Sequence, residues 1–184
     1  MYRTPRPRRT GAALIACLFA AGSSLSPASA QLPIPSAGVI PDMAGATDRP
    51  DPAQRYKLAF DVKSTGPANA VNPALIGIAR IINTLRQQGV AADHIEATAV
   101  FHGPTIAVVT KNETYRNRTG AKANPNLGLL RELAAAGVKF VICGVSAAEQ
   151  NYTRDDMVPE ATMNMSATLT FIDLGLKGYV KVER

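Results

Sequence analysis

Three segments of the chain share one order: a helix with apolar periodicity, a glycine that ends it, and an apolar strand soon afterwards. Gly89, Gly137 and Gly178 stand at these three helix ends, where a left-handed residue commonly terminates a helix. Helices that lead into apolar strands are typical of βαβ units, which require parallel strands. The sequence therefore predicts a three-layer α/β fold, with a mostly parallel five-stranded sheet and helices on both faces.

Local signals place the elements along the chain. Strands are predicted at Tyr56–Val62, Ile95–Phe101, Val138–Ile142, Ala161–Met165 and Tyr179–Glu183. Helix starts are predicted where Asn72-Pro73, Asn124-Pro125 and Ser166 supply an N-cap. Apolar residues at helical spacing follow each start: Leu75, Ile78, Ile82 and Leu85, then Leu127, Leu130 and Leu133, then Leu169, Ile172 and Leu176.

Two segments between the second and third strands lack a clear period. Thr105–Val109 is β-branched, but Pro104 at a first-turn position favours a short helix there. Lys111–Ala123 is polar and basic, so we expect a solvated surface loop, with an anion-binding lid as the alternative.

The first thirty residues have the three parts of a secretory signal peptide. Four arginines (Arg3, Arg6, Arg8 and Arg9) precede the apolar run Ala12–Ala21, and Ala28-Ser29-Ala30 is a small-residue cleavage site. We therefore expect cleavage after Ala30 and export to the periplasm. The apolar run is too short for an integral membrane span. Arg8-Arg9 leaves the twin-arginine route open beside the general secretory route.

Removing this signal changes the charge of the chain. The formal net charge is +6, but without the four signal arginines there are 16 basic and 14 acidic residues, a net charge of +2. The basic character thus belongs largely to the signal, and we expect no nucleic acid partner. Cys17 also leaves with the signal, so Cys143 is the one cysteine of the mature chain and no internal disulfide is possible.

Residues 31–54 form a proline-rich stretch with no helical or strand period. It holds Pro33, Pro35, Pro41, Pro50 and Pro52 among small residues. This composition predicts a linker or arm, which we expect to be disordered. The alternative is that its apolar residues pack on the domain or on a partner: Leu32, Ile34, Val39, Ile40 and Met43. Residues 55–184 then make up one α/β domain.

Cys143 is the candidate reactive residue. It ends the predicted strand Val138–Ile142, and Ser146 and Glu149 have the spacing of a capping box that would start a helix at Ser146. The positive end of that helix would favour the reactive thiolate, and Gly144 would let a small ligand approach the sulfur. The alternative is a buried, inert thiol that serves as a small apolar side chain.

His102 ends another predicted strand and could reach the same edge of the sheet, which suggests a Cys–His pair. A third residue to orient the histidine is not evident, and a turn histidine with a backbone partner is the alternative. His94 and His102 do not have metal-ligand spacing, and phosphate-binding glycine motifs are absent from the sequence. We therefore expect neither a metal nor a cofactor.

Several motifs resemble the DsrE/DsrF-like sulfur-carrier family. They are N-P-N-L, A-G-V, V-I-C-G-V-S, F-H-G-P, V-P-E-A-T and G-Y-V-K-V, and they occur between Tyr56 and Glu183. The resemblance implies a flavodoxin-like α/β layer, a homo-trimer or homo-hexamer, and a cysteine, Cys143, that carries sulfur as a persulfide. It implies a sulfane-sulfur donor and a thiol acceptor, a protein or a small molecule, as partners. Whether this makes the chain a sulfurtransferase stays open.

The sequence thus favours an exported sulfur carrier in which Cys143 reacts and His102, Gly144 and Ser146 line its pocket. Without a C-x-x-C pair, a lone thiol suits persulfide relay better than dithiol redox chemistry. The alternatives are a non-catalytic module that binds a small ligand or a protein beside a buried cysteine, and a scaffold that assembles through the proline-rich arm.

Overall fold

The computed structural model describes residues 1, 32–41 and 43–184. The chain divides into two compact units, Met1–Ala30 and Gln31–Arg184, and the second contains the folded domain. The expected export signal falls in residues 2–31 and so lies outside the described residues. In the part of the chain that is described, no helix is both long and apolar enough to cross a membrane.

The second unit is an α/β domain built on a five-stranded sheet. The strands are β1 (Tyr56–Val62), β2 (Ile95–Phe101), β3 (Val138–Cys143), β4 (Ala161–Asn164) and β5 (Val180–Glu183). The helices are α1 (Pro73–Gln87), α2 (Asn112–Thr119), α3 (Leu127–Ala135), α4 (Gly144–Glu149) and α5 (Ala167–Leu176), with 3₁₀ helices η1 (Pro35–Ala37), η2 (Ala92–His94), η3 (Gly103–Val109) and η4 (Arg154–Asp156).

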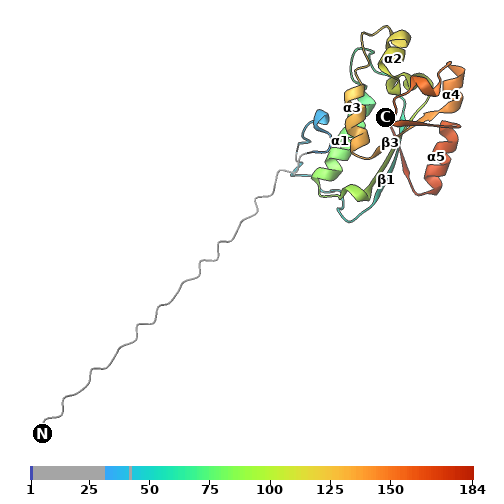
Figure 1. Cartoon of the computed structure of the whole chain (residues 1–184). Helices are drawn as coiled ribbons and strands as arrows, with labels where there is room; N and C mark the ends of the chain where they lie inside the picture. Colours follow the sequence, from blue (N-terminus) through green and yellow to red (C-terminus); the bar gives the residue numbers. More distant parts are fainter. Residues whose placement is uncertain (2–31, 42) are drawn as a thin grey trace. The chain divides into compact units, whose positions relative to one another are not determined.

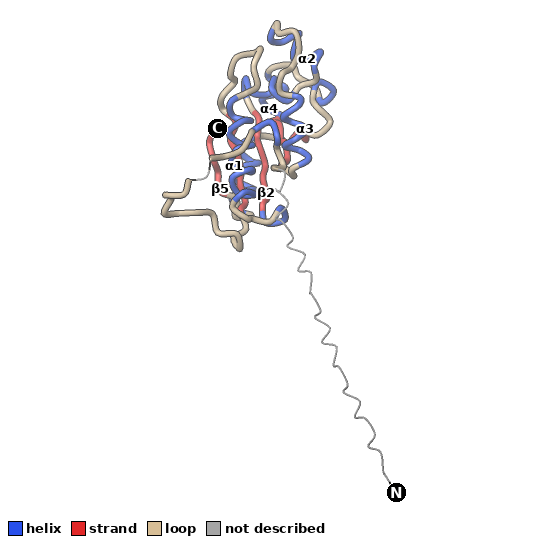
Figure 2. The backbone as a smooth tube through the Cα atoms, turned by 90° about the vertical axis from the view of Figure 1, so that its left-hand side faces the viewer, coloured by secondary structure: helices blue, strands red, loops and turns tan. Residues whose placement is uncertain are grey.

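All neighbouring strands are parallel, in the order β4-β3-β2-β1-β5. The chain runs from β1 through β3 to the β4 edge and then returns, through α5, to the far side of β1. Helices α1 and α3 cover one face of the sheet and α5 lies on the other (Figure 1). The side that carries α1 and α3 faces the viewer in Figure 2. This reversal is expected, because right-handed crossovers that progress in opposite directions place their helices on opposite faces. The predicted α/β class is confirmed.

The helix ends follow the predicted glycine pattern. Gly89, Gly137 and Gly178 have φ angles of 90°, 90° and 83°, the left-handed conformation. The helix starts also agree in two cases: the Asn72 side chain accepts a hydrogen bond from the Ala74 N–H, and Ser166 accepts one from Leu169. Each glycine ends its helix without the steric cost that a Cβ would impose there.

The main core lies between the sheet and helices α1 and α3. It contains the predicted apolar positions of α1 (Leu75, Ile78, Ile82 and Leu85), which are all at most 6% exposed. The apolar stripe of α5 behaves differently: Leu169, Ile172 and Leu176 are 52%, 54% and 84% exposed. These three side chains point away from the sheet, so α5 presents an apolar surface to the outside.

The predicted loop Lys111–Ala123 is wrong, because α2 forms within it. This helix has an acidic residue in its first turn, two arginines in its last turn and Gly120 as a left-handed end, all favourable to a helix. Its anchor is Tyr115, which is 4% exposed and donates its hydroxyl proton to the Ala68 carbonyl at 2.9 Å. One buried aromatic residue thus holds a helix that has no apolar period.

The prediction that Asn124 caps α3 is wrong, because that helix begins only at Leu127. Its side-chain carbonyl instead accepts the Asn126 N–H at 3.0 Å, and its amide donates to the carbonyls of Val108 and Thr110. The buried asparagine therefore joins η3 to the start of α3.

The proline-rich arm is docked on the domain, which corrects the expectation of disorder. Ile34 has no exposed surface and exchanges two hydrogen bonds with the Asn83 side chain of α1, at 3.2 and 2.8 Å. The Ser36 N–H donates to the Glu132 carboxylate of α3 at 2.9 Å. The arm therefore closes the outer end of the α1–α3 layer.

Ile34→Ala should lower the free energy of unfolding by about 2–5 kcal/mol, the usual effect of truncating a fully buried aliphatic side chain. The matched control Val39→Ala, in the same arm at 77% exposure, should change it by no more than about 0.5 kcal/mol. Urea unfolding of both variants measures this difference. Equal effects of the two substitutions would show that the arm is not docked.

Candidate functional site

Cys143 lies where β3 ends, on the sheet face that carries α5. Side chains alternate along a strand, and Phe140 and Ile142 belong to the core beneath α1 and α3. Val141 and Cys143 therefore face α5. The Cys143 side chain is a free thiol in a residue that is only 5% exposed.

The sulfur lies among backbone N–H donors. The Ser146 N–H points at Sγ with an N···S distance of 3.5 Å. Burial raises the pKa of the Cys143 thiol, but hydrogen bonds from Ser146, Ala167 and Val145 together outweigh it and hold that pKa below its ordinary value. Ala167 is the first residue of α5, so the starts of two helices contribute to stabilising the thiolate.

Helix α4 begins two residues earlier than the sequence predicted. It starts at Gly144, Cys143 is its N-cap, and Ser146 occupies the third helical position. The Ser146–Glu149 capping box is therefore wrong as the helix start. The Cys143 sulfur accepts the N–H that a capping hydroxyl would normally accept, so the cap and the candidate nucleophile are the same residue.

Gly144 allows close packing at the turn that follows Cys143. A Cβ built there would lie 2.7 Å from the Asn164 carbonyl oxygen and 3.3 Å from that of Met165. The Val145 N–H donates to the Met165 carbonyl at 3.0 Å. The absent side chain thus lets the junction between β4 and α5 pack directly onto the turn that follows Cys143, which brings the α5 start to the sulfur.

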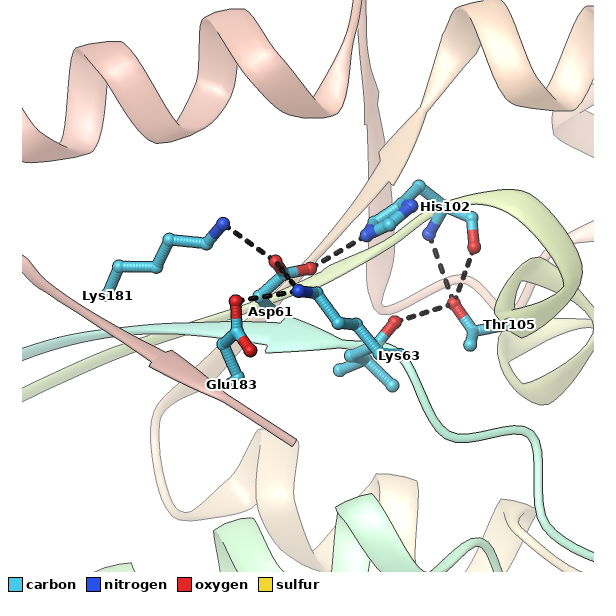
Figure 3. A network of polar contacts seen from close by, with 7 residues as sticks. Asp61, Lys63, His102, Thr105, Lys181 and Glu183 are labelled. Atoms are coloured by element: carbon cyan, nitrogen blue, oxygen red, sulfur yellow. Dashed lines mark hydrogen bonds and ion pairs between the residues drawn. The ribbon is translucent and has the colours of Figure 1, made fainter.

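His102 has a carboxylate partner that sequence reasoning missed. Its Nε2 lies 2.7 Å from Oδ1 of Asp61, a residue of β1 that is 2% exposed. Asp61 also contacts Lys181 Nζ at 2.8 Å and Lys63 Nζ at 3.8 Å, and Figure 3 shows the three cationic or basic side chains converging on it. The sequence feature that could have indicated this partner is Asp61 itself, an acidic residue inside the apolar strand Tyr56–Val62.

This network fixes the charge of Asp61 and the position of His102. Burial raises the pKa of the Asp61 carboxyl, yet hydrogen bonds and charge interactions with Lys181 and His102 bring it below its ordinary value. The His102 main chain is held by Thr105, whose Oγ1 accepts the His102 N–H at 3.1 Å and donates to its carbonyl at 2.8 Å. The His102 backbone is therefore fixed at the end of β2, and its ring points towards the ionised Asp61 carboxylate.

The sheet brings His102 beside Cys143. Phe101 pairs with Ile142 in the parallel register of β2 and β3, so the next residues, His102 and Cys143, occupy neighbouring positions. Both face the α5 side, and adjacent strands lie about 4.8 Å apart. Of the predicted pocket residues, Gly144 and Ser146 follow Cys143 in the turn, and His102 approaches from the neighbouring strand.

A groove of about 580 Å³ runs along α5 over the open part of the same sheet face. Its floor includes Thr98, Val141 and Thr162, and Asn164 and Thr170 line it near the end of β4. Val141 and Asn164 are the strand neighbours of Cys143 on this face. Among the described residues, no group of three or more His, Cys, Asp or Glu side chains could hold a metal ion.

Gly144→Ala should destabilise the fold by about 1–3 kcal/mol, because its Cβ collides with a backbone oxygen, and should raise the pKa of the Cys143 thiol by displacing the α5 start. Gly128→Ala is the matched control: it lies in α3 with open space around it, and should stabilise slightly, by less than about 1 kcal/mol. Thermal unfolding and thiol titration measure both effects. A Gly144→Ala protein as stable as the control would contradict this packing.

The family comparison covers this whole arrangement. The sequence matches the DsrE/DsrF-like family over residues 46–182. No curated protein matches the sequence. Among solved structures, the protein of unknown function MTH1491 from Methanobacterium thermoautotrophicum is similar, with a TM-score of 0.52 and 15% identity over 70% of this chain and 99% of that chain. At this identity the likeness concerns the fold alone. Because the family match spans the sheet, the His102 strand end and Cys143, the chain belongs to the DsrE/DsrF-like family.

Proposed function

We propose that this protein is an exported sulfur carrier that holds sulfane sulfur as a persulfide on Cys143. The observation that carries the proposal is the environment of the sulfur, in which the Ser146 side chain and N–H groups from the starts of α4 and α5 lower the thiol pKa. A thiolate is the nucleophile in sulfur transfer. Family membership adds support, because it suggests a sulfur relay role.

The chemistry needs one sulfur atom on the protein. The Cys143 thiolate attacks the outer sulfur of a donor such as thiosulfate. A new S–S bond forms while the bond to sulfite breaks, and sulfite leaves with the electron pair. An acceptor thiolate then attacks the outer sulfur of the persulfide, which restores the Cys143 thiolate. No net oxidant is required, so the absence of a second cysteine from the mature sequence is compatible with this cycle.

The same N–H groups suit the intermediate. A persulfide is an anion at neutral pH, and hydrogen bonds from backbone N–H groups favour the charged form of a buried group. Ser146 adds its side chain as a further hydrogen-bond donor to the sulfur, and Gly144 keeps the surrounding turn compact. Cys143 thus has several hydrogen-bond donors around it, as an anionic sulfur needs.

The test of this function uses protein recovered from the cell envelope, where we expect export to leave Gln31 as the first residue. After treatment with thiosulfate or polysulfide, mass spectrometry should show an added sulfur atom on Cys143, and Cys143→Ser should show none. Iodoacetamide alkylation of the native protein should have its midpoint below the ordinary thiol pKa of 9.0. A thiol that stays unmodified by donors and resists alkylation at high pH would support the binding module instead.

We also propose that the protein is a homo-oligomer, a trimer or a hexamer, that uses the apolar surface of α5. This surface consists of Leu169, Ile172 and Leu176, and exposed Met165 and Val145 extend it towards Cys143. Contiguous apolar surface of this kind is typical of protein interfaces.

Light scattering of the purified protein should give a mass of three or six chains. Ile172→Lys should dissociate the assembly, because it places a charge in the apolar interface. Val39→Lys, at an exposed position of the arm, is the control and should leave the mass unchanged. A wild-type protein with the mass of a single chain would rule out this assembly.

A further inference from the structure

Asp61 is a buried carboxylate near the carboxyl end of β1, the strand between β2 and β5. Its side chain is 3% exposed, and a buried charge is costly unless it is paired and hydrogen-bonded. The ion pair with Lys181 at 2.8 Å would meet that need by itself. The second short contact, 2.7 Å to His102 Nε2, therefore calls for a separate explanation.

Asp61, His102 and Cys143 form a row across three adjacent strands. Asp61 pairs with Val100 on β2, two residues before His102. On β3 the printed register ends with Phe101 opposite Ile142, and His102 and Cys143 are the residues that follow these two. All three side chains are on the α5 face, and all three lie at the carboxyl ends of their strands. The order across the sheet is carboxylate, imidazole, thiol.

The contact with Asp61 selects one state of the imidazole ring. An ionised carboxylate only accepts hydrogen bonds, so Nε2 must carry the proton that it shares with Oδ1. In the neutral ring Nδ1 is then the unprotonated nitrogen, and it lies on the side of the ring away from Asp61 (Figure 3). Strand β3, with Cys143 at its end, is the neighbour of β2 on the side opposite to β1.

We propose that Asp61 is a positioning residue that acts through His102, holding the ring with Nδ1 free to take the proton of the Cys143 thiol. The inference rests on the proposed function only in taking Cys143 as the reacting group. In this step the S–H bond breaks, the sulfur keeps the electron pair, and the proton bonds to Nδ1. The imidazolium that forms is balanced by the Asp61 carboxylate.

The other charged groups around the ring do not supply this function. Among the described residues, the charged groups that contact the Asp61 carboxylate besides His102 are Lys63 and Lys181, and Glu183 joins them through Lys63. Lys63 is held mainly by Glu183 at 2.6 Å, and Lys181 by Asp61. Both ammonium groups would disfavour a protonated imidazole, so the Asp61 carboxylate is the group that stabilises one.

The competing explanation makes Asp61 a purely structural counter-ion that ties β5 to β1 through Lys181. The two explanations differ in whether the effect of Asp61 on Cys143 needs His102. A double-mutant cycle on the rate of iodoacetamide alkylation, measured from acidic to alkaline pH, separates them. Alkylation needs no sulfur donor, so its outcome is independent of whether the protein carries sulfur.

Asp61→Asn should slow alkylation at neutral pH about 10-fold and move its midpoint up by about one pH unit. The reason is that the asparagine amide can donate to Nε2, which leaves the ring proton on Nδ1. His102→Gln should have a similar effect, and Asp61→Asn added to His102→Gln should change the rate by less than about twofold. An unchanged profile in Asp61→Asn, or an equal shift in the His102→Gln background, would overturn the proposal.

The control is Asp156→Asn, which removes a different carboxylate whose role is to accept the Thr153 N–H at 2.7 Å. It should leave the alkylation profile as in the wild type, and a shift equal to that of Asp61→Asn would overturn the proposal. If Asp61→Asn fails to fold, the position of the proton on the His102 ring of the wild-type protein tests the proposal instead. Its ¹⁵N NMR spectrum at alkaline pH should show the proton on Nε2, whereas a proton on Nδ1 would refute the inference. Labelling of the wild-type protein with thiosulfate, done in parallel, tests the sulfur-carrier function separately from the role proposed for Asp61.

Discussion

Parallel pairing of every strand is the constraint on which this structure depends. Two parallel strands cannot be joined by a tight turn, so the chain must return across the sheet between strands. The crossovers use the helices that the glycines at positions 89, 137 and 178 terminate. The same pairing collects the carboxyl ends of all five strands at one edge, as it does in other open α/β sheets that bind ligands there. Residues far apart in the sequence, such as Asp61 and Cys143, become neighbours of one histidine only through this arrangement.

At that edge, two buried groups have their pKa values lowered by different means. Asp61 is stabilised as an anion by cationic side chains, with Lys181 at 2.8 Å. Cys143 is stabilised by the Ser146 side chain and by backbone N–H groups, which carry no net charge. These donors are not lost on titration, whereas the side-chain network around Asp61 depends on the ionisation of its members. The Cys143 sulfur therefore keeps its hydrogen-bond donors as the pH changes, and the ion pairs of Asp61 do not.

Local sequence signals predicted most of the fold, and what they missed was tertiary in origin. The cap at Asn72 and the strand Tyr56–Val62 are encoded within a few residues, and the structure has them as predicted. Helix α2 was missed because its buried residue, Tyr115, is held by a carbonyl 47 positions earlier. Docking of Ile34 was only the alternative expectation, because its partner, Asn83, is a polar residue in an otherwise apolar helix face. In both cases long-range contacts override a local pattern that indicates a loop.

The candidate site shows the same division. Cys143 and His102 could be proposed as site residues because each ends an apolar strand, but the contact of Asp61 with His102 depends on strand order and register, which no local pattern contains. The start of α4 was misplaced because a cysteine seldom serves as a cap, whereas here the Cys143 sulfur accepts the Ser146 N–H. The Asn164 carbonyl lies so close to Gly144 that a Cβ there would collide with it. That approach also brings the α5 N–H to the sulfur. Packing at residue 144 therefore affects the thiol directly. A side chain there would change the distance between the β4–α5 junction and Cys143, and with it the pKa of the thiol.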